Sequence, residues 1–223
     1  MNIIKTIFSR PIPKCLSRQL CRAAVFTLLL WECPGNLFAQ TVGRIWVSMP
    51  DSLMPILTAK QRADIVNKDN IALSVPTTNA LSGTSKADTL TADYLSVHIT
   101  DVSSVQMRLL STSTGDSLVC LVRTWLGPEA ESSVGIYTKD WQQVASPTFS
   151  ISDFVHRPDT MAVEKYNELL RVLDPYTFSV QLSPEAPVLT VTPHAVTATT
   201  DEKKMLEAVF VQRKYNWNGR DFN

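Results

Sequence analysis

Alternation of apolar and polar residues through the middle of the chain constrains the fold more strongly than any other feature of this sequence. The alternation is clear in ADYLSVHIT (92–100) and in SVQMRLLS (104–111), and a period of two is typical of strands with one buried face. The next segment, SLVCLVRTWL (117–126), is almost continuously apolar, which suits a central strand covered on both faces. Short joints separate these segments, so we expect consecutive strands to pair as an antiparallel meander.

Weaker patterns extend the predicted sheet in both directions along the chain. Further strands are expected at 71–75, 133–138, 141–144, 177–183, 187–193 and 208–217. Apart from the short edge strand, residues 70–91 are expected to form a loop, and 41–49 a short strand or an extended lead-in. Asn218-Gly219 is the strongest two-residue hairpin signal, and residues 220–223 are expected to pair back across it.

Helical patterns flank the predicted strands. Helices are expected at 51–57, 59–67, 160–173 and 201–206. Thr58 followed by Gln61 three residues later is a capping-box pattern, and Asp159 is expected to cap the 160–173 helix, whose apolar residues fall on one face. Together these elements predict an α+β fold, mostly antiparallel sheet with helices packed on one face. Two arrangements of these elements stay open. One is a pair of tandem helix-plus-meander halves, 50–145 and 153–223, and the other is a single sheet whose helices share one face.

The N-terminal segment has the layout of a secretory signal peptide. Five cations and no acid precede an apolar run at 23–31, and Pro34-Gly35 then leads to Ala39 and Gln40. The run of nine residues is far shorter than the roughly 20 that a membrane-spanning helix needs. We therefore expect residues 1–39 to be a signal peptide, cleaved after Ala39 or Gln40. The mature domain, 40–223, would be periplasmic or extracellular, with no permanent membrane span.

Removal of the signal peptide changes the charge and the cysteine content. The mature chain keeps 16 of the 21 Lys and Arg against 20 of the 21 Asp and Glu, a net charge of −4. A mildly acidic chain without a basic cluster is not expected to bind nucleic acid. Three of the four cysteines leave with the signal peptide, so Cys120 has no partner for a disulfide and is expected to be a buried apolar residue.

Local motifs for catalysis, metals and cofactors are absent from the sequence. His98, His156 and His194 are far apart, and no second His or Cys stands at ligand spacing beside any of them. The sequence has no G-x-S-x-G elbow, Walker loop or G-x-G-x-x-G motif. We therefore predict no catalytic residue, no metal site and no cofactor from sequence.

Aromatic residues near predicted strand ends, and two acids on a predicted loop, are the remaining candidates for a binding surface. The candidate binding residues are Trp125, Glu129, Glu131, Tyr137, Trp141, Tyr215 and Trp217. Aromatic residues at strand ends can form a recognition face for protein or sugar, although packing in the core is the more common role. For the two acids, a place on a solvated turn is the more common role.

Four segments resemble a domain-of-unknown-function family of secreted Bacteroidales proteins. They are PDSLMPILTAKQR, LTADYLSV, CLVRTWLGPEAESSVGIYTKDW and YNWNGRDF, and they are spread over nearly the whole mature chain. The resemblance implies an exported or envelope protein with an α+β fold, and it implies no activity.

The function itself is not determined by the sequence. The first hypothesis is a non-enzymatic binding or accessory module of the envelope, with an envelope protein or a glycan as its partner. The alternative is a carboxylate-dependent hydrolase of glycan or peptide substrates, using acids near Glu129 and Glu131, since glycosidases need two facing carboxyl groups.

Overall fold

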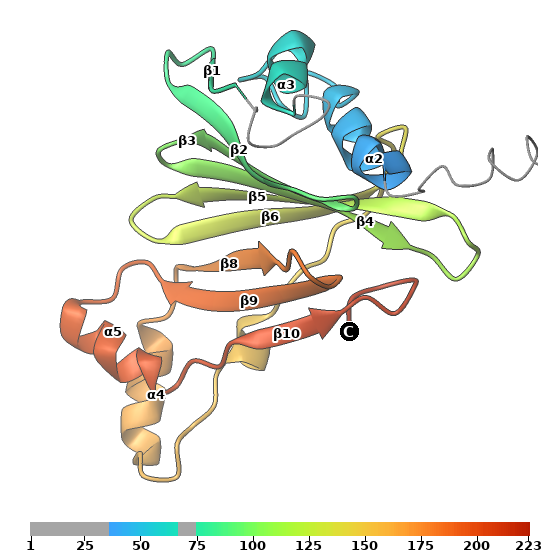
Figure 1. The fold of residues 1–223 in the computed structure, drawn as a ribbon. Helices are drawn as coiled ribbons and strands as arrows, with labels where there is room; N and C mark the ends of the chain where they lie inside the picture. The colour runs from blue at the N-terminus through green and yellow to red at the C-terminus, as the bar shows by residue number, and fades with distance from the viewer. Residues whose placement is uncertain (1–35, 67–74) are drawn as a thin grey trace, which may run out of the picture. The chain divides into compact units, whose positions relative to one another are not determined.

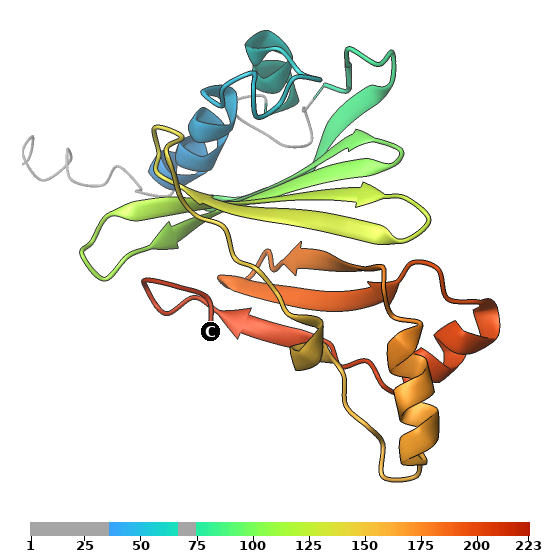
Figure 2. The same ribbon diagram turned by 180° about the vertical axis from the view of Figure 1, so that it is seen from behind.

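The computed structural model describes residues 36–66 and 75–223, and it describes side chains from residue 42 onward. Nearly all of the predicted signal peptide, and all but the last residue of the predicted edge strand at 71–75, lie outside the described residues. Within residues 36–223 the chain forms two antiparallel sheets with helices around them (Figure 1; Figure 2 gives the view from behind).

The larger sheet is a seven-stranded antiparallel meander in which each strand pairs with the next one in sequence. Its strands are β1 (Thr77–Thr78), β2 (Thr84–Leu90), β3 (Tyr94–Thr100), β4 (Ser103–Ser111), β5 (Ser117–Leu126), β6 (Ala130–Tyr137) and β7 (Gln143–Ala145). The predicted meander is therefore confirmed. The prediction of a loop over 84–90 was wrong, because pairing with β3 overrides the weak strand propensity of TSKADTL.

Helix α2 (Asn36–Val47) lies over one face of the larger sheet (Figure 1). The expectation of a strand or extended lead-in at 41–49 was wrong. Val42, Ile45, Trp46 and Met49 are all buried, and their spacing of three, one and three residues is that of a helix face. The predicted cleavage points, after Ala39 or Gln40, fall within α2, but every one of these buried residues lies beyond them.

Helix α3 (Ala59–Ile65) begins at the predicted capping box. The Thr58 hydroxyl accepts a hydrogen bond from the Gln61 amide, and the Gln61 side chain accepts one from the Thr58 amide. Residues 51–57 form turns rather than the predicted helix. The buried Arg62 guanidinium donates to the carbonyl oxygens of Met49 and Leu57, so these carbonyls on either side of the turns are satisfied by a side chain.

Replacing Thr58 with Ala is expected to lower the free energy of unfolding by about 1 kcal/mol, because the cap of α3 is lost. Urea denaturation of the two proteins measures the change. Lys60→Ala, an exposed substitution in the same helix, is the matched control and should change stability by less than about 0.5 kcal/mol. Equal effects of the two substitutions would contradict a capping role for Thr58.

The larger sheet is covered on both faces. Val119 and Leu121 of β5 face the core cluster shared with α2 and α3, whereas Cys120 and Val122 face the cluster shared with the smaller sheet. This confirms the prediction that 117–126 is a central strand with two covered faces. Cys120 is fully buried, as predicted, and burial raises the pKa of its thiol to about 12.

The smaller sheet lies against the second face of the meander. Its strands are β8 (Tyr176–Leu182), β9 (Val188–Ala195) and β10 (Arg213–Asn216), in the order β10-β9-β8. The predicted final strand at 208–217 is shorter than expected, because α5 (Thr200–Glu207) and a turn occupy the chain up to Val209. The predicted hairpin at Asn218-Gly219 is confirmed, with paired hydrogen bonds between Asn216 and Asn223.

Helix α4 (Val163–Arg171) packs against α5 beside the smaller sheet, around a third cluster that includes Leu169 and Leu206. The predicted cap at Asp159 is wrong, since the helix begins after Ala162 and no side chain caps it. The prediction of a mostly antiparallel α+β fold is confirmed. Helices packed on one face, and two tandem halves, are not confirmed, because the two sheets differ in strand number and share one core cluster.

Candidate functional site

Strand β8 approaches the larger sheet with its free edge, and side chains of that sheet satisfy its outward-facing amides. The Val180 amide donates to Ser132 Oγ and the Leu182 amide donates to Gln106 Oε1, each at 2.9 Å. At the start of the strand, the Thr177 hydroxyl donates to the Ala130 carbonyl at 3.0 Å. These bonds fix β8 against β6 and β4 of the larger sheet.

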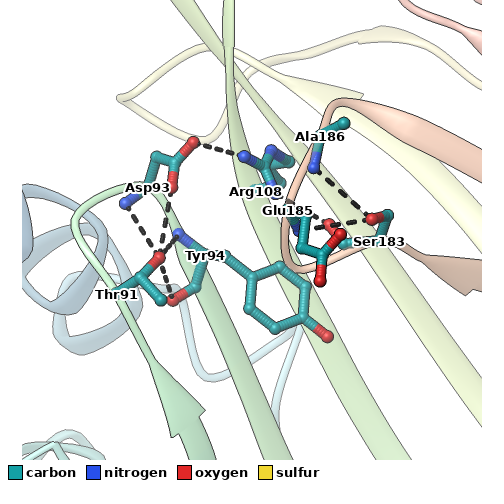
Figure 3. A network of polar contacts seen from close by, with 7 residues as sticks. All are labelled: Thr91, Asp93, Tyr94, Arg108, Ser183, Glu185 and Ala186. Atoms are coloured by element: carbon teal, nitrogen blue, oxygen red, sulfur yellow. Dashed lines mark hydrogen bonds and ion pairs between the residues drawn. The ribbon is translucent and has the colours of Figure 1, made fainter.

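The other end of β8 is held by Arg108 (Figure 3). This buried guanidinium donates to the Ser183 carbonyl at 2.7 Å and to Asp93 Oδ2 at 2.6 Å. Ser183 Oγ in turn accepts from the amides of Glu185 and Ala186, which closes the turn between β8 and β9. The register of β8 and β9 is therefore anchored to the larger sheet at both ends of β8.

One face of the β8–β9 pair is polar. Burial alternates along β9, so that Val191 is buried whereas Thr192 and His194 are partly exposed. Ser179 of β8 pairs directly opposite Thr192, which places Ser179 and His194 on the same face as diagonal neighbours. The Ser179 hydroxyl lies 2.7 Å from His194 Nε2, within hydrogen-bond distance.

The opposite side of the His194 ring faces a carboxylate from the β5–β6 turn. Glu129 Oε2 lies 3.4 Å from His194 Nδ1, and Lys203 Nζ of α5 lies 2.5 Å from the other oxygen, Oε1. A carboxylate can only accept, so the contact with Glu129 favours the tautomer with the imidazole proton on Nδ1, in which Nε2 accepts from the Ser179 hydroxyl. Four side chains, from β8, β9, α5 and the β5–β6 turn, thus form one ordered chain of polar contacts.

The protonation of His194 is controlled by its surroundings. Partial burial lowers the pKa of the imidazole below its ordinary value of 6.5, and the neighbouring Lys203 cation lowers it further. The Glu129 carboxylate acts in the opposite direction but does not reverse the shift. The imidazole is therefore neutral at pH 7.

His194 is expected to make the folded protein less stable in mild acid. Because its pKa is depressed in the folded state, the unfolded chain binds the proton first, and stability is lost as the pH falls from 6.5 through the lower folded pKa. Urea midpoints at pH 7.5 and pH 5.5 measure this. His194→Gln should reduce the difference between the two pH values, whereas His156→Gln at an exposed position should leave it unchanged. Identical pH dependence in all three proteins would contradict the assignment.

A hollow of about 340 Å³ opens beside this cluster, between β9 and α5. The residues that line it are Glu129, Thr192, Pro193, His194, Ala195, Lys203, Glu207, Phe210 and Gln212. They supply a hydroxyl, an amide, an imidazole, an ammonium and two carboxylates around an aromatic ring. This volume lies within the range of sites for small molecules.

A second hollow, of about 570 Å³, follows the outer edge of β10 and includes Tyr215, one of the predicted binding residues. Tyr215 and Trp217 are half-buried against the second core cluster, and the Trp217 indole donates to the Ser111 carbonyl at 2.7 Å. These two aromatic residues therefore have packing roles, and Tyr215 also faces this hollow.

The other predicted aromatic residues separate into buried and exposed positions. Tyr137 and Trp141 are 4% and 8% exposed in the first core cluster, with ring centroids 5.7 Å apart, so the structure places them in the core rather than on a recognition surface. The Trp141 indole donates to Ser48 Oγ at 3.2 Å, which ties the β6–β7 turn to the end of α2. Trp125 is 47% exposed and pairs across the β5–β6 hairpin with the exposed Glu131.

Of the predicted site residues, only Glu129 lies within the polar cluster. Ser179, His194, Lys203 and Glu207 were not predicted as site residues. Alternation along 177–183 and 187–193 could have placed Ser179 and His194 on one polar face, but no sequence pattern connects Glu129 with Lys203, which is 74 positions away.

The described residues provide neither a metal-binding group nor a helix able to span a membrane. Across 36–66 and 75–223, no group of three or more His, Cys, Asp or Glu side chains is arranged to hold a metal ion. Among the helices in these ranges, none combines the length and the apolar character that crossing a bilayer requires.

The fold and the cluster define an α+β protein of two antiparallel sheets, with a polar hollow beside the smaller one. The model of a family described as a protein of unknown function (DUF3256) matches residues 35–222, so the chain belongs to this family. Among curated proteins, none matches the chain. The predicted resemblance to a family of unknown function is therefore confirmed.

A similar fold is known from a solved structure, that of a domain of an uncharacterized protein from Porphyromonas gingivalis W83, a member of the Bacteroidales. The two chains are 24% identical, with a TM-score of 0.68, and the match covers 82% of this chain and 98% of the other. At this identity the likeness concerns the fold alone.

Proposed function

We propose that this protein is exported to the cell envelope and acts there as a binding or accessory module for a glycan or an envelope protein. The observation that carries the proposal is the hollow beside α5, where hydroxyl, amide, imidazole and charged groups surround the Phe210 ring. Convergent polar groups around an apolar surface are typical of ligand sites. The variety of hydrogen-bonding groups suits a hydroxyl-rich ligand such as a sugar.

Export is supported by the basic N-terminal segment followed by a short apolar run. Cleavage after Ala39 or Gln40 would keep the buried α2 residues Val42, Ile45 and Trp46. N-terminal sequencing of the protein recovered from envelope and cytosolic fractions tests this. A mature end at Gln40 or Thr41 in the envelope fraction is expected, and an intact N-terminus in the cytosol would overturn the export proposal.

The alternative of a two-carboxylate hydrolase is less well supported. A glycosidase places two carboxyl groups across a cleft. Glu129 borders the hollow, but Glu131 is exposed on β6 and is not among the residues that line it. Binding is therefore the function that the geometry supports best.

Affinity capture from an envelope extract tests the binding proposal. Mature protein, Gln40 to Asn223, is immobilised, and retained proteins and glycans are identified by mass spectrometry. Glu207→Gln alters the hollow, and Glu185→Gln, at an exposed site on the β8–β9 turn, is the matched control.

We expect the wild type and Glu185→Gln to retain the same component. Glu207→Gln should retain about one tenth of it or less, which is the effect expected when one charged contact is lost. Retention that is equal in all three proteins would place binding elsewhere, and no retained component would overturn the binding proposal.

A further inference from the structure

The polar cluster contains a hydroxyl, an imidazole and a carboxylate, which are the parts of a nucleophilic site. No sequence motif predicts this arrangement. Ser179 Oγ lies 2.7 Å from His194 Nε2, and His194 Nδ1 faces Glu129 Oε2 at 3.4 Å. A hydroxyl, an imidazole and a carboxylate in this order are the arrangement by which hydrolases on unrelated folds activate serine. We propose that Ser179 is an acyl-transfer nucleophile, with His194 as its general base and Glu129 as the group that orients the imidazole, and that the substrates are carboxylic esters.

The geometry defines a role for each group. The Glu129 carboxylate keeps the imidazole proton on Nδ1, and the Lys203 ammonium at its second oxygen holds this carboxylate in place. The lone pair of Nε2 then points at the Ser179 hydroxyl and can take its proton. The neutral imidazole expected at pH 7 is the form that this role requires.

The proposed reaction balances with water as the only co-reactant. The proton of Ser179 passes to His194 Nε2 while Oγ bonds to the ester carbonyl carbon. The intermediate then expels the alcohol, which takes the proton from Nε2, and leaves an acyl-serine. Water attacks this acyl group, gives one proton to Nε2, and the released serine oxygen recovers that proton as the carboxylic acid departs.

The hollow lies next to this chemistry, although Ser179 itself is not among the residues that line it. His194 and Glu129 line it, and so does Thr192, the residue directly opposite Ser179 in the strand pairing. Gln212 Nε2 donates to Thr192 Oγ1 at 2.8 Å, so its second N–H is the neighbouring side-chain donor for a developing oxyanion. An acyl ester on a hydroxyl-rich ligand would fit the polar side chains of the hollow. Only the hydroxyl-rich character of the substrate rests on the binding proposal.

Reaction of the full-length protein with a fluorophosphonate probe, followed by peptide mass spectrometry, tests the nucleophile. We expect one modified residue in the wild type, Ser179, and no modified residue in the Ser179→Ala variant. Labelling of His194→Gln should be slower by about 100-fold and that of Glu129→Gln by at least about tenfold. Ser152→Ala removes an exposed serine on a different segment and should label like the wild type.

The rate of labelling should also rise with pH as His194 loses its proton, and then reach a plateau. The midpoint of this rise is expected below pH 6.5. The charged groups that face this ring are Glu129, Lys203 and, around the same hollow, Glu207. Hydrolysis of p-nitrophenyl acetate by the wild type, lost in Ser179→Ala, is the corresponding turnover measurement.

Absence of labelling in folded wild type, labelling of another serine, or equal labelling of Ser179 in the His194→Gln variant would each overturn the proposal. Thermal unfolding of every variant shows whether a loss reflects misfolding. Ser179→Ala should lose labelling but keep ligand capture, because Ser179 is not among the residues that line the hollow, so failure of the binding proposal and failure of the nucleophile proposal give different results.

Discussion

Trp46→Ala is expected to lower the free energy of unfolding by about 3–5 kcal/mol, the cost of truncating a large, fully buried aromatic side chain. The indole packs in the core cluster between α2 and the larger sheet, and its Nε1 donates to the Arg62 carbonyl at 3.0 Å. Truncation leaves a cavity and removes the indole's hydrogen bond to this carbonyl, in a domain whose total stability is typically about 5–15 kcal/mol.

Chemical denaturation followed by circular dichroism measures this change. Trp125→Ala is the matched control, because the same substitution at a 47% exposed position should cost less than about 1 kcal/mol. If Trp46→Ala does not fold, Trp46→Phe keeps most of the volume and should still lose about 1 kcal/mol or more through the lost N–H donor. A Trp46→Ala protein as stable as Trp125→Ala would show that α2 is not part of the folded core.

Arg108→Met is expected to cost about 2–3 kcal/mol. Methionine retains the length and apolar surface of the side chain, but it cannot donate to the Ser183 carbonyl, which loses a charge-assisted bond of 2.7 Å. The pair with Asp93 adds little, because that carboxylate is 44% exposed and water screens it. The loss should be accompanied by loosening of the β8–β9 turn that Figure 3 shows around Ser183.

Urea denaturation gives the stability of the Arg108 variant, and hydrogen exchange at the Glu185 and Ala186 amides reports on the turn, since both donate to Ser183 Oγ. Arg171→Met, at an exposed position in α4, is the matched control and should change neither measurement. Unchanged stability and unchanged exchange in Arg108→Met would contradict the role of Arg108 in joining the two sheets.

Strand periodicity predicted the centre of this fold well, because alternation records which face of a strand is buried. The pattern around Leu95 and Met107 corresponds to paired, adjacent strands, and the capping box at Thr58 and Gln61 forms as expected. The same reasoning failed at 41–49, where Val42 and Trp46 are buried by a helical spacing that overlaps a weak alternation. It also failed at 84–90, where the partner strand rather than local propensity determines the structure.

The sequence by itself determined the antiparallel meander, the burial of both faces of β5 and the hairpin at Asn218-Gly219, because local periodicity and turn chemistry control these features. Only the tertiary structure decided that Tyr137 and Trp141 are core residues. It also decided that Glu129, Ser179, His194 and Lys203 meet at one corner of the smaller sheet. The physical reason is that the docking of β8 onto the larger sheet, through contacts between residues more than 40 positions apart, determines which side chains become neighbours.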